Sequence, residues 1–99
     1  MELTLLYFED CPNWKLADEA LQVVARDLPD ATIKRQLVDT AEEAARLGFR
    51  GSPSILADGV DLFADADAPI GLSCRRYRTP AGPAGSPTVD QLRAALTRH

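Results

Sequence analysis

The stretch Phe8 to Trp14, which reads FEDCPNW, joins the two elements whose order decides the predicted fold. Glu2 to Phe8 is a short apolar and aromatic run, which is typical of a buried β-strand. From Pro12 onward, apolar residues recur three and four positions apart, as in a helix that packs on a sheet: Trp14, Ala17, Leu21, Val24 and Leu28. Proline suits the first helical turn because its missing N–H would lack a partner there anyway. The sequence therefore places Cys11 where a strand passes into a helix.

A second strand and helix follow this unit. Ala31 to Val38 mixes apolar and polar residues, which predicts a strand nearer the edge of the sheet. Thr40 and Glu43 form a T-x-x-E capping pattern, and Gly48 supplies a left-handed stop, so we expect a short helix between them. A helix that joins two neighbouring strands implies that these strands are parallel.

The end of the chain predicts a hairpin and a last helix. Asp58-Gly59 favours a tight turn between antiparallel strands at 54–57 and 60–63. Thr88 with Gln91 is a second capping pattern, and it precedes an apolar helical face. The expected fold is α/β, a single domain over residues 1–99 with a mixed four-stranded sheet in the order βαβαββα, covered by helices.

One long segment does not fit this pattern. Ala64 to Pro87 separates the hairpin from the last helix, and structureless loops of this length are uncommon unless they are functional. Its second part, TPAGPAGSP, is rich in proline and glycine and is expected to be irregular. Gly71 to Tyr77 is a candidate short strand within this insert.

Composition limits the possible partners and location. The 99 residues carry 11 Lys and Arg against 15 Asp and Glu, a net charge of −4, with 45% hydrophobic residues. This composition is that of a globular protein, and its acidic balance argues against a nucleic-acid partner. No apolar run is long enough to cross a membrane, and the first residues lack the features of a signal peptide. We therefore expect a cytoplasmic protein with no membrane partner.

Cys11 is the first candidate for chemistry. A thiol at the start of a helix faces unpaired N–H groups and the positive end of the helix dipole, and both favour the thiolate. A thiolate in this position is a nucleophile. The alternative is that Cys11 is a small, inert, buried residue that happens to precede a helix.

The combination of several features resembles the thioredoxin-like superfamily. These features are C-P-x-W at a helix start, a second strand and helix, Gly51-Ser52-Pro53 ahead of a hairpin, and a final helix. The resemblance covers about residues 2–63 and 88–97. It implies a thioredoxin fold with Cys11 as the redox-active nucleophile and a cis-proline at Pro53 facing it. It also implies that Ser52 offers its backbone to an extended, thiol-bearing substrate by strand-like pairing.

The motif departs from thioredoxins at its fourth position. Thioredoxins carry C-x-x-C, whereas Trp14 replaces the second cysteine here, so a second thiol must come from elsewhere. Pro12 and Trp14 are candidate substrate contacts beside Cys11. The helical spacing favours a packing role for Trp14 against the sheet.

Cys74 is the internal candidate for that second thiol. It lies in the insert after the predicted hairpin, and in thioredoxin-like proteins the chain leaving that hairpin passes close to the active-site edge. Arg75, with Arg76 and Arg78, could stabilise a thiolate or hold a carboxylate or phosphate. The alternatives are that Cys74 only anchors the insert and that the arginines form a solvated surface.

Three functions fit these residues. The leading one is a thiol-disulfide oxidoreductase in which Cys11 attacks and Cys74 or an external thiol resolves, with a thiol or disulfide protein or a small-molecule thiol as partner. It needs no cofactor and no bound metal. A second is a dithiol protein that traps a soft ion such as Hg(II), Cu(I) or arsenite, and similar chains carry the label alkylmercury lyase-like, with Asp10 as the nominal proton donor. A third is a non-catalytic thioredoxin-like adaptor with a peptide groove near Pro53.

Overall fold

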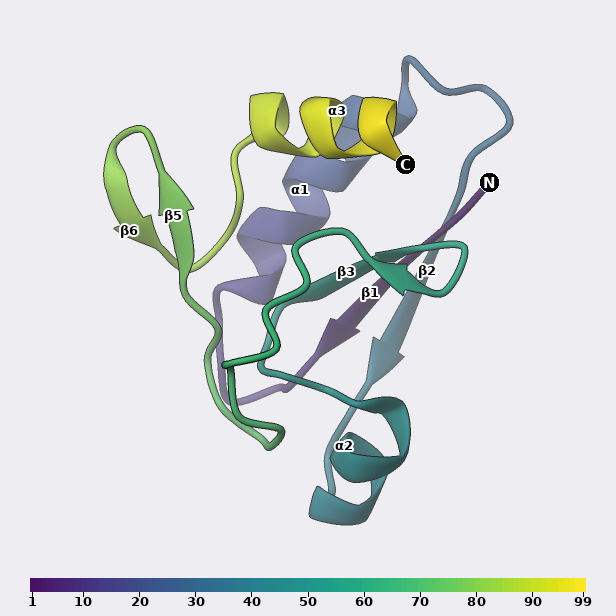
Figure 1. The fold of residues 1–99 in the computed structure, drawn as a ribbon. Helices are drawn as coiled ribbons and strands as arrows, with labels where there is room; N and C mark the ends of the chain where they lie inside the picture. The colour runs from purple at the N-terminus through teal and green to yellow at the C-terminus, as the bar shows by residue number, and fades with distance from the viewer.

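The computed structural model describes all residues 1–99 and contains a mixed four-stranded sheet with three helices (Figure 1). The elements that follow the predicted order are β1 (Glu2–Tyr7), α1 (Trp14–Ala25), β2 (Thr32–Leu37), α2 (Ala41–Leu47), β3 (Ser54–Ala57), β4 (Val60–Asp61) and α3 (Val89–Arg98). The strand order in the sheet is β2-β1-β3-β4. The predicted α/β architecture and the place of β2 at the sheet edge are confirmed.

The sheet is mixed because its connections differ. The first connection contains α1, and β1 pairs with β2 in parallel, with Leu5 opposite Arg35. β3 pairs antiparallel with β1, and Leu5 lies opposite Ile55. β3 and β4 form the predicted hairpin, in which Asp58 has a positive φ of 49° and Gly59 a φ of 85°. This left-handed pair is the geometry that the Asp-Gly dipeptide favours.

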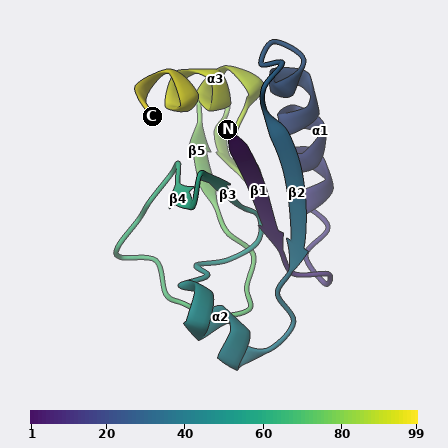
Figure 2. The same ribbon diagram turned by 90° about the vertical axis from the view of Figure 1, so that its right-hand side faces the viewer.

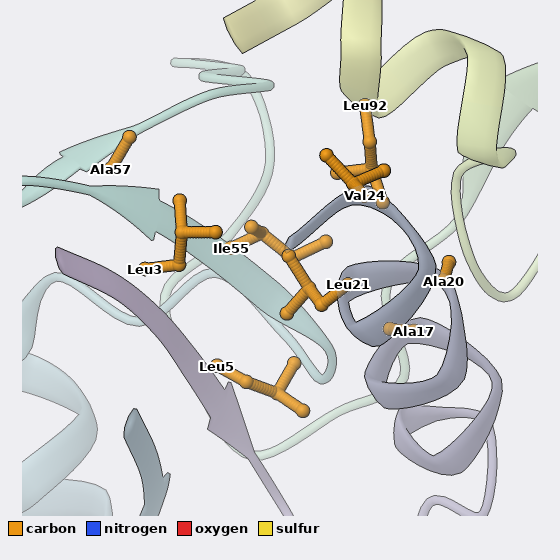
Figure 3. Packing of buried hydrophobic residues seen from close by; sticks show 9 residues of the cluster. All are labelled: Leu3, Leu5, Ala17, Ala20, Leu21, Val24, Ile55, Ala57 and Leu92. Atoms are coloured by element: carbon orange, nitrogen blue, oxygen red, sulfur yellow. The ribbon is translucent and has the colours of Figure 1, made fainter. Parts of the chain in front are cut away.

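The two faces of the sheet pack against different helices. α1 and α3 cover one face (Figures 1 and 3), where the core cluster consists of Leu3, Leu5, Ala17, Ala20, Leu21, Val24, Ile55, Ala57 and Leu92. α2 lies at the other face with a smaller cluster made of Leu6, Val38, Ala44 and Phe49. Alternate residues of β1 supply the two clusters, because side chains of a strand point alternately to opposite faces.

Element boundaries differ from the prediction for local reasons. β4 ends at Asp61 rather than Phe63, because the Asp61 carboxylate accepts a hydrogen bond from the Phe63 amide at 2.9 Å and turns the chain. α1 ends at Ala25, and Leu28 follows in a tighter turn in which its amide donates to the Ala25 carbonyl at 3.0 Å. Thr40 accepts a hydrogen bond from the Glu43 amide, whereas the Glu43 side chain pairs with Arg46.

The insert contains an element that the sequence reading missed. β5 (Tyr77–Thr79) and β6 (Gly82–Ala84) form a separate two-stranded antiparallel hairpin, which projects beside α1 and α3 in Figure 1. The expectation of an irregular 79–87 stretch is therefore wrong in part. The candidate strand at 71–77 is also wrong, since only Cys74 forms an isolated bridge there and β5 begins at Tyr77. Figure 2 shows the insert running from β4 past α2 before it returns to β5.

Candidate functional site

Cys11 lies in the turn between β1 and α1. Its amide donates to the Phe8 carbonyl at 3.0 Å, and the helix begins at Trp14, later than the predicted start at Pro12. Cys11 is completely buried, with 0% of its surface exposed. Two polar groups lie close to its sulfur, the Ser52 carbonyl oxygen at 3.6 Å and the Asn13 side-chain nitrogen at 3.9 Å. The hydrogen-bond donor beside the sulfur is thus the Asn13 side-chain amide, and no backbone amide donates to it.

The structure joins Cys11 to Cys74 in a disulfide. The two residues are 63 positions apart in the sequence, and their Cα atoms lie 5.8 Å apart, within the usual range for a disulfide. There is no free cysteine. The sequence left open whether Cys74 lies near Cys11, and the fold brings the two together.

The backbone of Ser52 holds the segment that carries Cys74. The Ser52–Pro53 peptide bond is cis, as the resemblance implied. The Ser52 amide donates to the Ser73 carbonyl at 2.7 Å, and the Arg75 amide donates to the Ser52 carbonyl at 2.8 Å. This pairing forms a parallel bridge between Ser52 and Cys74. The backbone edge that the resemblance assigns to a substrate is therefore occupied by residues 73–75 of the same chain.

Arg75 makes internal contacts. Its residue surface is 6% exposed, and its guanidinium donates to the Asp61 carboxylate at 2.8 Å and to the Ser54 hydroxyl at 3.1 Å. The Phe63 carbonyl accepts a further hydrogen bond from it. These groups all belong to β3, β4 and the residues that follow β4. The guanidinium that was predicted to hold a substrate anion is thus already paired, and Arg76 and Arg78 are the exposed cations next to Cys74.

Gly51 allows Arg75 to approach this closely. The φ of Gly51 is 111°, a conformation that side chains disfavour, and a Cβ there would lie 3.0 Å from the Arg75 Cβ. Gly85, after β6, allows the Asn13 side chain to approach in the same way, because a Cβ there would overlap that side chain. The insert therefore packs closely at two places where a glycine is required: Arg75 against Gly51, and Gly85 against Asn13 in the turn after Cys11.

Tyr77 fixes the insert at a second point. Its hydroxyl donates to the Pro53 carbonyl, and its ring lies edge-on to Phe63, with centroids 5.4 Å apart. The Arg75 guanidinium lies 5.0 Å from the centre of the Tyr77 ring. Burial raises the pKa of the Tyr77 phenol well above its usual range, and the positive charge of Arg75 opposes this shift.

The two other predicted site residues differ in their surroundings. Trp14 is half-buried, stacks on Tyr7 with ring centroids 4.4 Å apart, and packs against the core cluster of α1 and α3. These contacts agree with the packing role that its helical spacing favoured. Pro12 is exposed next to Cys11 and remains a candidate contact for a partner.

Sequence reasoning missed Asn13, Asp61, Tyr77 and Gly85. One signal was present for Tyr77: in the run from Cys74 to Arg78, an extended chain would point residues 75 and 77 to the same side. The partners of these residues could not be read from the sequence, because they lie on other elements.

The site offers no third metal ligand. No group of three or more histidine, cysteine, aspartate or glutamate side chains gathers anywhere in the chain. Asp10, the nominal proton donor of a lyase, therefore does not form a cluster with the two cysteines. None of the three helices has the length and apolar character that crossing a bilayer requires.

Comparison of the chain with protein-family models, with curated proteins and with solved structures gives no match. The protein is therefore described by its own architecture. It is an α/β domain with a mixed four-stranded sheet, and a disulfide begins in the turn after its first strand.

Proposed function

We propose that this protein is a thioredoxin-like thiol-disulfide exchange protein in which Cys11 and Cys74 form the redox pair. The observation that carries the proposal is their disulfide, which joins the turn after β1 to a segment paired with Ser52. Cys74 thus stands in for the second cysteine that the C-P-N-W motif lacks. In the reductive direction, two thiols of the partner are oxidised to a disulfide, and Cys11 and Cys74 become thiols.

Contacts around the pair support reversible opening. Residues 73–75 are held by the two backbone hydrogen bonds to Ser52, and Arg75 and Tyr77 anchor the same segment to Asp61 and Pro53. None of these contacts needs the S–S bond. The reduced cysteines therefore remain near each other, which keeps the effective concentration of one sulfur at the other high.

The first experiment follows exchange with glutathione. The oxidised protein is incubated with reduced glutathione and the reduced protein with glutathione disulfide, and thiols are trapped by alkylation over time. We expect reversible conversion at a rate about a hundredfold above that of an unstructured peptide disulfide, because neighbouring groups activate exchange sulfurs. Circular dichroism should show the same fold in both forms.

The single variants Cys11→Ser and Cys74→Ser are the matched controls, and neither should form the intramolecular Cys11–Cys74 disulfide. A purely structural disulfide would give one of two other results. Exchange no faster than in the peptide, or loss of the fold on reduction, would contradict the proposed function.

A second candidate function, trapping of a soft metal ion, is favoured by the same proximity. Two thiolates that can form a disulfide can also bind one Hg(II) or Cu(I), since thiolates select soft ions. Binding of one Hg(II) per reduced chain in the presence of excess glutathione, lost in both single-cysteine variants, would support it. Binding that persists in either variant would exclude a two-sulfur site.

A further inference from the structure

The two sulfurs of the disulfide lie in very different surroundings. Cys11 is completely buried, whereas Cys74 is exposed on the segment that precedes β5. We propose that an external thiol attacks the sulfur of Cys74 and that Cys11 is the leaving sulfur. This inference rests on the proposed function and reverses the roles that the sequence resemblance assigns to the two cysteines.

The direction of attack explains why burial matters. A thiolate approaches a disulfide along the S–S axis, from the side opposite the sulfur that leaves. Attack on Cys11 would require approach through the turn at residues 8–13, where Asn13 and Gly85 are in contact. Attack on Cys74 comes from the side of the exposed insert. Access therefore favours Cys74.

The charged residues next to each cysteine also favour attack on the sulfur of Cys74. Glu9 and Asp10 are exposed directly before Cys11. On the other side, Arg76 and Arg78 are exposed and form no ion pair, and they alternate along the chain with the buried Arg75 and Tyr77. An extended chain places Arg76 about 7 Å from Cys74, measured between Cα atoms. A negatively charged thiol is thus attracted toward Cys74 and repelled near Cys11.

The site also has a group suited to receive the charge on the leaving sulfur. The Asn13 side-chain nitrogen lies 3.9 Å from the Cys11 sulfur. Its N–H can donate a hydrogen bond to a thiolate on Cys11, and hydrogen bonds to a charged acceptor are stronger than those to a neutral one.

The thiolate of the partner forms a bond to the Cys74 sulfur, the Cys11–Cys74 bond breaks, and its electron pair leaves on Cys11 as a thiolate. A second partner thiolate then attacks the partner's sulfur in the mixed disulfide. This releases the partner's disulfide and leaves Cys74 as a thiolate, and both cysteines take protons from solvent.

The experiment identifies the attacked sulfur in the wild-type protein. The oxidised protein is mixed briefly with reduced glutathione and then quenched with excess N-ethylmaleimide in denaturant, and the peptides that contain each cysteine are analysed by mass spectrometry. We expect glutathione on Cys74 and N-ethylmaleimide on Cys11, with at least a tenfold excess over the opposite pattern. Glutathione on Cys11, or an equal division, would overturn the inference and leave exchange itself intact. No reaction at all would overturn both proposals.

A charge test gives a second readout. The double variant Arg76→Gln, Arg78→Gln should react about fivefold more slowly with the anionic glutathione, whereas the rate with the cationic cysteamine should be unchanged or higher. Arg26→Gln, at an exposed arginine at the end of α1, is the matched control and should change neither rate. Equal rates with glutathione in wild type and double variant would contradict attack beside the two arginines.

Discussion

At the scale of single residues, the run from Cys74 to Arg78 separates two tasks by simple alternation. Cys74, Arg76 and Arg78 are exposed, whereas Arg75 and Tyr77 are buried against β3 and the residues after β4. An extended backbone points successive side chains in opposite directions, so one short segment can both anchor itself and present a sulfur. The inward residues hold the segment in place, and the outward residues face a partner.

Tyr77 gives a prediction for alkaline pH. Burial raises the pKa of its phenol above the ordinary value of 10.0, so the folded protein keeps a proton that the unfolded chain loses. Tyr77 therefore contributes its full stabilisation below about pH 10, and this contribution decreases as the pH rises above that value. The stability difference between wild type and Tyr77→Phe, measured by urea unfolding, should be largest near neutral pH and shrink between about pH 10 and pH 11.

The half-buried Tyr7 provides a comparison for the loss of a hydroxyl at neutral pH. Tyr7→Phe removes the hydroxyl of the other tyrosine, which stacks on Trp14 and makes no hydrogen bond through that hydroxyl. At neutral pH it should cost less stability than Tyr77→Phe, whose hydroxyl donates to the Pro53 carbonyl. A Tyr77→Phe difference that stays constant over the whole range would contradict the burial argument.

At the scale of elements, the contact between Arg75 and Asp61 ties the insert to β4. The Arg75 side chain is 5% exposed and that of Asp61 23% exposed, so removal of the carboxylate charge leaves a largely buried guanidinium unpaired. We expect Asp61→Asn to lower the free energy of unfolding by about 3 kcal/mol. Urea denaturation of the oxidised protein measures this loss.

A nearby acidic residue allows a matched comparison. Asp65→Asn also removes one negative charge, four residues further along the chain, but the Asp65 side chain is exposed and only accepts a hydrogen bond from the Asp67 amide. It should cost less than about 0.5 kcal/mol. Equal effects of the two variants would show that the Arg75 contact does not fasten the insert.

At the scale of the whole molecule, the disulfide closes a large loop. Its two cysteines are 63 positions apart, and the loop between them contains the whole of α1, β2, α2, β3 and β4. A loop of this size, when cross-linked, lowers the entropy of the unfolded chain by an amount worth about 4 kcal/mol. Reduction should therefore decrease the free energy of unfolding by about that amount while the fold persists.

The measurement compares urea unfolding with and without a phosphine reductant. The variant Cys11→Ala, Cys74→Ala should match the reduced protein and be insensitive to the reductant. A loss well below 1 kcal/mol would contradict this account of the cross-link, in which it acts on the entropy of the unfolded chain. A reduced protein without native circular dichroism would conflict with a redox cycle.

Some features could be predicted because neighbouring residues determine them. The periodic apolar residues of α1, the Asp58-Gly59 turn and the capping box of Thr88 with Gln91 all depend on hydrogen bonds and burial within a few positions. The β5–β6 hairpin was missed because Gly82 and Pro83, which normally indicate a loop, lie inside a strand there. A two-stranded hairpin outside the main sheet tolerates a proline that a central strand would not.

The sequence by itself determined the order of the three helices and of the four strands of the main sheet, and the position of Cys11 after the first strand, since local periodicity and turn residues specify both. Only the tertiary structure decided that Cys74 bonds to Cys11, that Arg75 pairs with Asp61, and that residues 73–75 form hydrogen bonds with the backbone of Ser52. The physical reason is that these contacts depend on the path of the long insert. That path is fixed by interactions between residues far apart in the chain.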